Sequence, residues 1–310
     1  MKAEYRKGCP QRDSVERQEY AGARSTGSRE RKERDGATGL LEEILDRDNL
    51  NQAYKRVKRN HGAPGIDGMT VEEALPWLKE HKEELLLSIR DGSFTPNPVR
   101  RKSIPKPDGN GERKLGIPTV IDRIIQQAIA QKLQPIFEPR FSDGSYGYRP
   151  GRSGQQAMQK VKTYADDGYT QVVEVDLSKY FDTSNHELLM NLLRKQIQDT
   201  RVIGLIKKYL KSGVMENNIF CRTEEGSPQG GPLSPLLANI YLNEFDQEME
   251  RRGVPVVRYA DDIVVFARSK RAAERLLESS RKYLENHLKL TSHFICINPY
   301  IMMLCFFSLT

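Results

Sequence analysis

The chain has 310 residues, enough for one large domain or two modest ones. It carries 49 Lys and Arg against 42 Asp and Glu, and the net charge of +7 suits a polyanionic partner without proving one. Its four cysteines form no C-x-x-C pair, so neither a zinc knuckle nor a disulfide framework is indicated and a reducing cytoplasm is expected. No apolar run reaches the roughly 20 residues of a membrane-spanning helix, so no membrane association is expected.

The N-terminal part alternates flexible and helical segments. Residues 1–36 contain almost no large apolar residues and predict a disordered basic leader. Apolar residues at helical spacing predict a helix over residues 39–60. The loop "GAPGIDG" (62–68) follows, and a second helix over residues 71–92 should end at Asp91-Gly92, a typical helix stop.

Strands and helices alternate through the remainder. Residues 94–119 surround a "DGNG" turn and predict a hairpin, and residues 171–182 predict a strand that runs into a polar turn. "VVRYADDIVVF" (256–266) predicts a second hairpin with two aspartates at its tip. This alternation indicates an α+β fold with a mixed sheet. Helices are expected over residues 120–137, 153–168, 185–197, 200–213 and 269–288, and after a Gly/Pro loop within 225–253.

Three aspartates lie at the ends of these predicted strands. Asp176 closes "VVEVD", and Asp261 and Asp262 lie side by side in the second hairpin. If the two segments are neighbouring strands, their carboxylates meet and repel, and divalent cations would reverse that repulsion. Two Mg²⁺ ions about 3.5–4 Å apart can stabilise the attacking and leaving oxygens of a phosphoryl displacement. The alternative is an ordinary turn, since Asp favours turns.

Seven blocks in order resemble the reverse transcriptases encoded by group II introns, over about residues 38–290. "YADD" alone would be weak, and retron or diversity-generating reverse transcriptases are alternatives that "GAPGIDG" disfavours. The other blocks are "IPKPDG", "GIPTVIDRIIQQAI", "FSDGSYGYRPGRS", "VDLSKYFD" and "GSPQGGPLSPLLANIYL".

The resemblance implies a right-hand polymerase: an α+β fold with fingers and palm, and a mixed or antiparallel palm sheet with packed helices. The expected domains are the leader (1–36), fingers with an N-terminal extension loop (37–165), palm (166–290) and an atypical apolar tail (291–310). The family continues past this point with a thumb, so the thumb is expected to be absent, as in a C-terminally truncated chain. The palm sheet would then expose an edge or be covered by the tail.

The resemblance assigns Asp176, Asp261 and Asp262 to catalysis, with Asp176, Asp261 and the carbonyl of Leu177 holding two Mg²⁺ ions. Asp262 would lie beside them at the primer end. The implied residues of the nucleotide site are Lys106 and Arg113 at the triphosphate, Phe181 under the sugar and Gln229 beside the base. A solvated basic hairpin and an ordinary loop are the alternatives.

Template contact is implied for Arg149, Arg152 and Gly230, although surface arginines at a helix start would explain the first two equally well. The expected function is RNA-directed DNA polymerase, with an RNA template or intron RNA, a DNA primer and deoxynucleoside triphosphates as partners. It would accompany intron splicing and mobility. A non-catalytic intron-RNA-binding maturase fragment and an inactive remnant are the alternatives, and the oligomeric state is left open.

Overall fold

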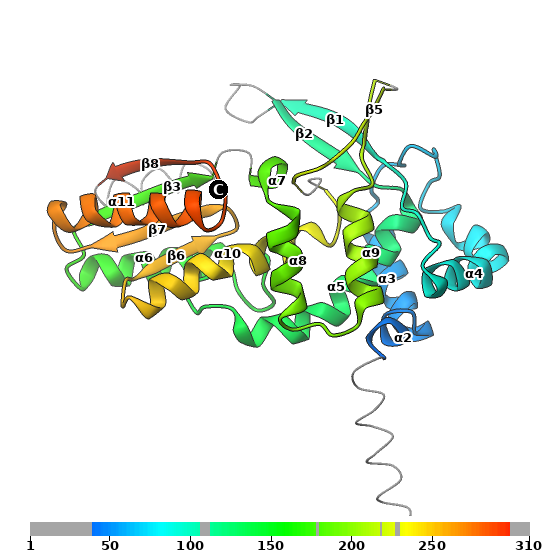
Figure 1. The fold of residues 1–310 in the computed structure, drawn as a ribbon, viewed down its shortest axis with the longest axis horizontal. Helices are drawn as coiled ribbons and strands as arrows, with labels where there is room; N and C mark the ends of the chain where they lie inside the picture. The colour runs from blue at the N-terminus through cyan, green and yellow to red at the C-terminus, as the bar shows by residue number, and fades with distance from the viewer. Residues whose placement is uncertain (1–38, 106–111, 178–179, 218, 227–229, 298–310) are drawn as a thin grey trace, which may run out of the picture.

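The computed structural model describes residues 39–105, 112–177, 180–217, 219–226 and 230–297. Each of two lobes contains a four-stranded sheet (Figure 1). The finger sheet has the order β2-β1-β4-β5 and the palm sheet the order β6-β7-β3-β8, named here after the predicted parts of the hand. The predicted leader lies outside the described residues. None of the helices in the described part is long and apolar enough to cross a membrane.

The finger sheet begins with the predicted hairpin of β1 and β2, which pair antiparallel. β4 runs parallel to β1, so this sheet is mixed. The two short strands β4 and β5 were not predicted from the sequence. Bounds of the strands in this lobe are β1 Val99–Pro105, β2 Glu112–Ile117, β4 Val214–Glu216 and β5 Ile219–Cys221. The helices around them are α2 Leu40–Ile44, α3 Arg47–Arg59, α4 Ala74–Asp91, α5 Val120–Phe137, α8 His186–Arg194 and α9 Thr200–Leu210.

The single helix predicted over residues 39–60 is in fact two, because the chain breaks at Leu45 and Asp46. Asp46 has an extended backbone (φ −56°, ψ 142°), and its carboxylate accepts hydrogen bonds from the amides of Asp48 and Asn49. That geometry caps a new helix rather than continuing the old one. The predicted stop at Asp91-Gly92 is confirmed, since Gly92 takes the left-handed conformation with φ 78°.

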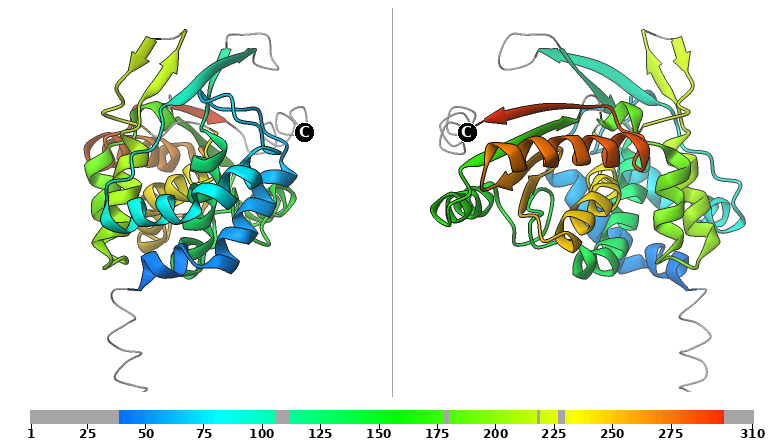
Figure 2. Two further views of the ribbon diagram at one scale, coloured as in Figure 1. Left: turned by 90° about the vertical axis from the view of Figure 1, so that its right-hand side faces the viewer. Right: turned by 60° about the vertical axis from the view of Figure 1, so that its left-hand side comes forward.

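All pairs in the palm sheet are antiparallel. Alternate residues of each strand face opposite layers: Val172 and Val264 pack with α6, whereas Val173 and Val175 pack with the larger core toward α11. Figure 2 shows α11 running along the palm sheet. Covering both faces explains why these strands read as nearly continuous apolar runs. The elements are α6 Gly154–Asp166, β3 Gln171–Leu177, β6 Val256–Tyr259, β7 Asp262–Ala267, α11 Lys270–Asn286 and β8 Ser292–Ile297.

β8 comes from the segment expected to be an atypical tail. It pairs with β3 from Leu177↔Ser292 to Val172↔Ile297, so the edge of β3 is covered by this part of the tail. The remaining tail residues lie outside the described part of the chain.

Helix α10 (Ser234–Arg251) joins the lobes. Its buried residues lie in the same hydrophobic cluster as residues of α5, α8, β3 and β7, so one core extends through both lobes. The short helices α7 (Tyr180–Thr183) and η1 (Glu138–Arg140) connect larger elements.

Candidate active site

The register of the palm sheet brings the predicted acidic residues together. β3 and β7 are hydrogen-bonded neighbours, and Val175 pairs with Ile263. One step further along both strands places Asp176 beside Asp262, and Asp261 precedes Asp262 in the turn between β6 and β7. The sequence-based expectation that these carboxylates meet at one sheet end agrees with this register.

The turn that carries Asp261 has an unusual backbone. Ala260 adopts a positive φ of 61°, a conformation that residues with a Cβ rarely take. Gly147 packs against it so closely that a Cβ there would lie 2.2 Å from the amide nitrogen of Ala260. Only glycine fits at position 147, and the turn is held between this loop and its own strands.

A cleft of about 1210 Å³ opens over the carboxylates. Asp176, Asp261 and Asp262 line it together with Leu177 and Phe181. Three basic residues also line it: Arg101 and Lys114 from the finger sheet and Arg123 from α5. The sequence analysis singled out none of these three; their signal was the basic composition of the hairpin and of "VIDR". An acidic floor and basic flanks suit a magnesium-bound polyphosphate.

The electrostatics of the floor are anionic. Within the described part of the chain, no ion pair reaches the carboxylate of Asp176 or Asp261. Glu174 lies on the same strand face two residues before Asp176, and burial, followed by the charge of Asp176, raises the pKa of its carboxyl. Burial also raises the pKa of the Tyr180 hydroxyl, and the nearby Tyr241 and Asp261 raise that pKa further. A bound cation would therefore be favoured beside the carboxylates of Asp176 and Asp261.

Magnesium fits this donor set. Among the described residues, no group of three or more His, Cys, Asp or Glu side chains is placed to hold a metal ion. Mg²⁺ is usually held by one or two carboxylates while waters and substrate phosphates complete its shell, so an open carboxylate pair matches that habit. The carboxylates of Asp176 and Asp261 would be the protein ligands, as predicted, with the carbonyl of Leu177 beside them.

Phe181 is half-buried at the cleft wall and is supported from behind. Its ring lies 5.2 Å from the ring of Tyr180 at an interplanar angle of 75°, and Tyr180 in turn meets Tyr241 edge-on at 6.0 Å. This aromatic stack restrains the ring that the resemblance places under the incoming sugar.

Gly230 and Gly231 join the lobes at the cleft. Gly230 has φ 115°, and a Cβ there would lie 2.3 Å from the carbonyl oxygen of Gly116 in β2. At Gly231, a Cβ would lie 2.4 Å from Oε1 of Gln126. Position 230 therefore requires glycine for the close approach of backbone, whereas at position 231 the flexible side chain of Gln126 would have to move. Lys106 and Gln229 lie outside the described residues, as does the side chain of Arg113, so the predicted nucleotide contacts of these three remain predictions.

The loop "GAPGIDG" is tied to α5 and β1 by two arginines. Arg123 Nη2 donates to the carbonyl of Ala63 at 2.9 Å, and Arg100 Nη2 donates to that of Pro64 at 2.6 Å. Gly62 lines the cleft beside Arg123. Template contact by this loop stays a prediction.

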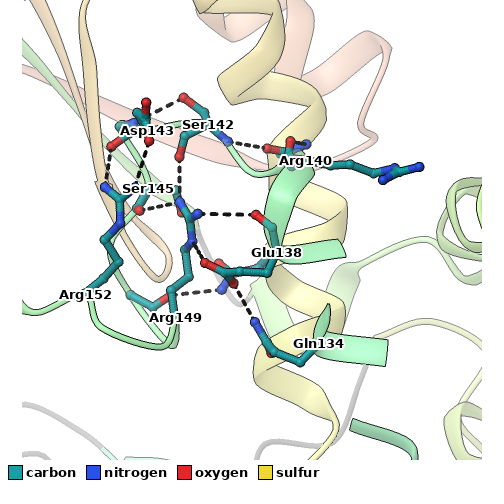
Figure 3. Close-up of polar contacts among 12 residues, drawn as sticks. Gln134, Glu138, Arg140, Ser142, Asp143, Ser145, Arg149 and Arg152 are labelled. Atoms are coloured by element: carbon teal, nitrogen blue, oxygen red, sulfur yellow. Dashed lines mark hydrogen bonds and ion pairs between the residues drawn. The ribbon is translucent and has the colours of Figure 1, made fainter. Parts of the chain in front are cut away.

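Arg149 and Arg152 differ in their surroundings (Figure 3). The side chain of Arg149 is only 4% exposed, pairs with Glu138 at 2.9 Å and donates to the carbonyls of Ser142 and Ser145. It holds the loop after α5 in place. Arg152 is more exposed and pairs with Asp143 at 2.7 Å. Both line a second cleft of about 820 Å³ next to the first. Template contact by the two arginines remains a prediction. The contacts of Arg149 show that it also stabilises the loop after α5.

Comparison with known proteins defines the class to which this geometry belongs. Residues 104–293 match the family described as reverse transcriptase (RNA-dependent DNA polymerase). Protein YkfC of Escherichia coli (strain K12) is 36% identical over 291 residues, which cover 81% of this chain and 76% of that protein. The group II intron-encoded protein LtrA of Lactococcus lactis subsp. cremoris is 40% identical over 210 residues. The chain belongs to the reverse transcriptase family.

Its relatives identify it further as a reverse transcriptase/maturase of the group II intron type. A solved Cas6-RT-Cas1–Cas2 complex contains a chain with the same fold, with a TM-score of 0.50 and 25% identity, covering 79% of this chain and 42% of that one. Telomerase from Candida albicans shares the fold at 11% identity, with a TM-score of 0.50, covering 67% of this chain and 44% of that one. The aligned region covers 68% of this chain and only 35% of LtrA.

Proposed function

We propose that the protein is an RNA-directed DNA polymerase that extends a DNA primer on an RNA template. The observation that carries this proposal is the β3–β7 register, which gathers Asp176, Asp261 and Asp262 below a cleft with basic flanks. Retroelement polymerases need such a carboxylate floor and little covalent chemistry from the protein, because positioning and charge stabilisation dominate phosphoryl transfer.

In the proposed reaction the primer 3′-hydroxyl oxygen attacks the α-phosphorus of a deoxynucleoside triphosphate. The new P–O bond joins nucleotide to primer, the bond between the α-phosphorus and the oxygen that bridges it to the β-phosphorus breaks, and pyrophosphate leaves with the electron pair. The proton of the 3′-hydroxyl is released to water. Two bound Mg²⁺ ions would neutralise charge on the attacking and leaving oxygens.

The residues of this chain would bind the metal ions, attract the polyphosphate and select the sugar. Asp176 and Asp261 would hold the ions, and Asp262 would lie toward the primer end. Arg101, Lys114 and Arg123 would attract the polyphosphate, with Lys106 and Arg113 as further predicted contacts. Phe181, restrained by Tyr180, would exclude a 2′-hydroxyl by contact with the sugar.

The biological setting that we propose is a group II intron. A polymerase of this kind would use the intron RNA as a template and would take part in splicing and mobility, as the names of its relatives suggest. The expected cytoplasmic location remains part of this proposal.

A second candidate, RNA binding without catalysis, is supported by the second cleft. Arg56, Lys132 and Arg152 line it with Tyr148 and Tyr259, whose side chains are 54% and 41% exposed. Basic groups with exposed aromatic rings suit single-stranded nucleic acid, which stacks bases on rings and pairs phosphates with cations.

One experiment distinguishes the two functions. Purified protein is given poly(rA)/oligo(dT), dTTP and Mg²⁺, and both primer extension and retention of labelled RNA are measured for the wild type and for Asp261→Ala. Polymerase activity predicts loss of extension in the variant, with RNA retention kept and weakened by salt. Asp166→Ala, which removes an exposed carboxylate from the end of α6, is the matched control.

Extension by Asp261→Ala at the wild-type rate would contradict the catalytic assignment. RNA retention by a wild type that extends no primer would favour the second candidate. If a cooperatively folded protein showed neither primer extension nor RNA retention, the alternative of an inactive remnant would be favoured.

A further inference from the structure

Arg258 is fully buried and lies three residues before Asp261 in the sequence. Its side chain has no exposed area although it carries a charge, and it lies in the strand β6. Burying a guanidinium is costly unless it is paired and hydrogen-bonded. Asp246 on α10 supplies the pairing: Nε donates to Oδ2 at 2.9 Å and Nη2 donates to Oδ2 at 2.7 Å.

The other N–H groups of Arg258 reach three further partners. Nη1 donates to Oδ1 of Asn239 at 2.8 Å and to the carbonyl oxygen of Ala260 at 2.9 Å, and Nη2 donates to the hydroxyl of Ser145 at 2.8 Å. All five donors of the guanidinium are thus used. We call these residues (Ser145, Asn239, Asp246 and Arg258) the Arg258 cluster.

The bond to Ala260 places this cluster directly behind the acidic turn. The Ala260 carbonyl begins the peptide that continues into Asp261, and Ala260 holds the disfavoured φ of 61°. On the same side, Asn239 Nδ2 donates to the carbonyl of Gly147 at 2.9 Å, which keeps Gly147 against the turn. A conformation that is disfavoured by itself persists only where its surroundings over-determine it.

We propose that Arg258 is the positioning residue of this turn: by fixing the Ala260 carbonyl, its guanidinium sets the Asp261 carboxylate in the place where a metal ion binds. This inference rests on the proposed function and adds a group that touches neither metal nor substrate. Arginine is required because a planar fork reaches Asp246, Asn239, Ser145 and Ala260 together, whereas a lysine ammonium has three donors from a single point.

Arg258→Lys tests the proposal because it keeps the buried charge beside Asp246. We expect the Mg²⁺ concentration for half-maximal primer extension to rise about tenfold or more, as is typical when a partner behind a metal ligand is lost. Binding of Mn²⁺ in the presence of dTTP, measured from the free-ion signal in electron paramagnetic resonance, should weaken in parallel. Arg201→Lys is the matched control, since it alters another arginine fork on a buried aspartate, Asp199, away from the palm sheet.

A second substitution separates positioning from general destabilisation. Glycine adopts positive φ freely, so Ala260→Gly in the Arg258→Lys background should restore part of the lost Mn²⁺ binding and extension. If Arg258→Lys does not fold, Ser145→Ala replaces it, because this variant removes one contact and leaves the Arg258–Asp246 pair intact. It should shift metal dependence in the same direction by a smaller factor.

Two results would overturn the inference: wild-type Mg²⁺ and Mn²⁺ dependence in the variant, or no recovery on adding Ala260→Gly. A wild type that extends no primer would refute the proposed polymerase instead. In that case the comparison of Mn²⁺ binding between the wild type and Arg258→Lys still decides the role of Arg258.

Discussion

Asp122 provides a prediction about stability that follows from burial alone. It lies in the first turn of α5 and is 1% exposed. Its Oδ2 accepts hydrogen bonds from the hydroxyl of Thr119 at 2.6 Å and from the amide of Asn97 at 3.2 Å. Its Oδ1 is buried without a well-formed hydrogen bond among the described residues, although the hydroxyl of Tyr209 is near enough to favour the carboxylate slightly. Burial raises the pKa of this carboxyl from 3.8 to about 6.

The shift has a definite sign. The folded protein binds the proton of Asp122 more tightly than the unfolded chain does, so the free energy of unfolding falls as pH rises from about 4 through 6. A shift of about 2 pH units is worth roughly 3 kcal/mol at 1.36 kcal/mol per unit. The positive end of helix α5 favours the carboxylate by about 0.3–1 kcal/mol. About 2 kcal/mol of destabilisation therefore remains above pH 7.

Asp122→Asn removes the charge and keeps the shape, because an amide oxygen can replace Oδ2. We expect the variant to exceed the wild type in free energy of unfolding by about 2 kcal/mol at pH 8 and to match it near pH 3, below the pKa of the unfolded carboxyl. Urea denaturation followed by circular dichroism at both pH values measures the difference. The exposed Asp166→Asn serves as the control and should show the same difference from wild type at both values.

A gain of the same size at both pH values would refute the reasoning, because it would show an effect unrelated to proton binding. A variant less stable than the wild type at pH 8 would also refute it.

Two further predictions concern the cleft and the loop behind it. Phe181→Ala should raise incorporation of ribonucleotides relative to deoxyribonucleotides by roughly tenfold or more, measured by single-nucleotide extension; unchanged discrimination would contradict the assignment of Phe181 to the sugar. Arg149→Met should lower the free energy of unfolding by about 3 kcal/mol, because it removes the cation that pairs with the Glu138 carboxylate at a largely buried site and leaves that carboxylate only its hydrogen bond from Gln134. Arg251→Met, at the exposed pair with Glu248, should have a much smaller effect in the same urea titration, because water screens that pair, and equal losses would argue against the distinction.

Local signals predicted most of the elements near the site. Apolar runs on both sides of Asp261 and Asp262 indicated a hairpin, and the structure has β6 and β7 there. The helix stop at Gly92 and the hairpin of β1 and β2 follow from turn chemistry in the same way. Each of these features is decided by residues close together in the chain, which is why pattern reasoning succeeds for them.

The Arg258 cluster could not be predicted in this way. In "VVRYADD", Arg258 lies two residues after Val256 and so on the same face of the strand, which indicates that a buried arginine there would need an acidic partner. Asp246 likewise interrupts the apolar residues of α10. Nothing in either pattern indicates that the two meet, because their contact and the one to Ser145 depend on how helix, sheet and loop pack.

The strand β8 was missed for a related reason. Residues after 290 differ in composition from those before, so they were expected to form an atypical apolar tail and no strand was assigned to them. An exposed edge or one covered by the tail were both expected from the sequence; the choice between them depends on pairing with residues of β3 more than 100 positions earlier, which an apolar sequence alone does not reveal.

That pairing has a consequence for the order in which the molecule assembles. β3 leaves the ribosome long before either of its neighbours, β7 and β8, has been made. At synthesis rates of about 5–20 residues per second, the strand that carries Asp176 waits on the order of 10 s for its last partner. Contacts so distant in sequence form slowly. The helices α2 to α5, by contrast, can begin to pack from neighbouring segments, so the acidic end of the palm sheet should be among the last parts of the protein to become ordered.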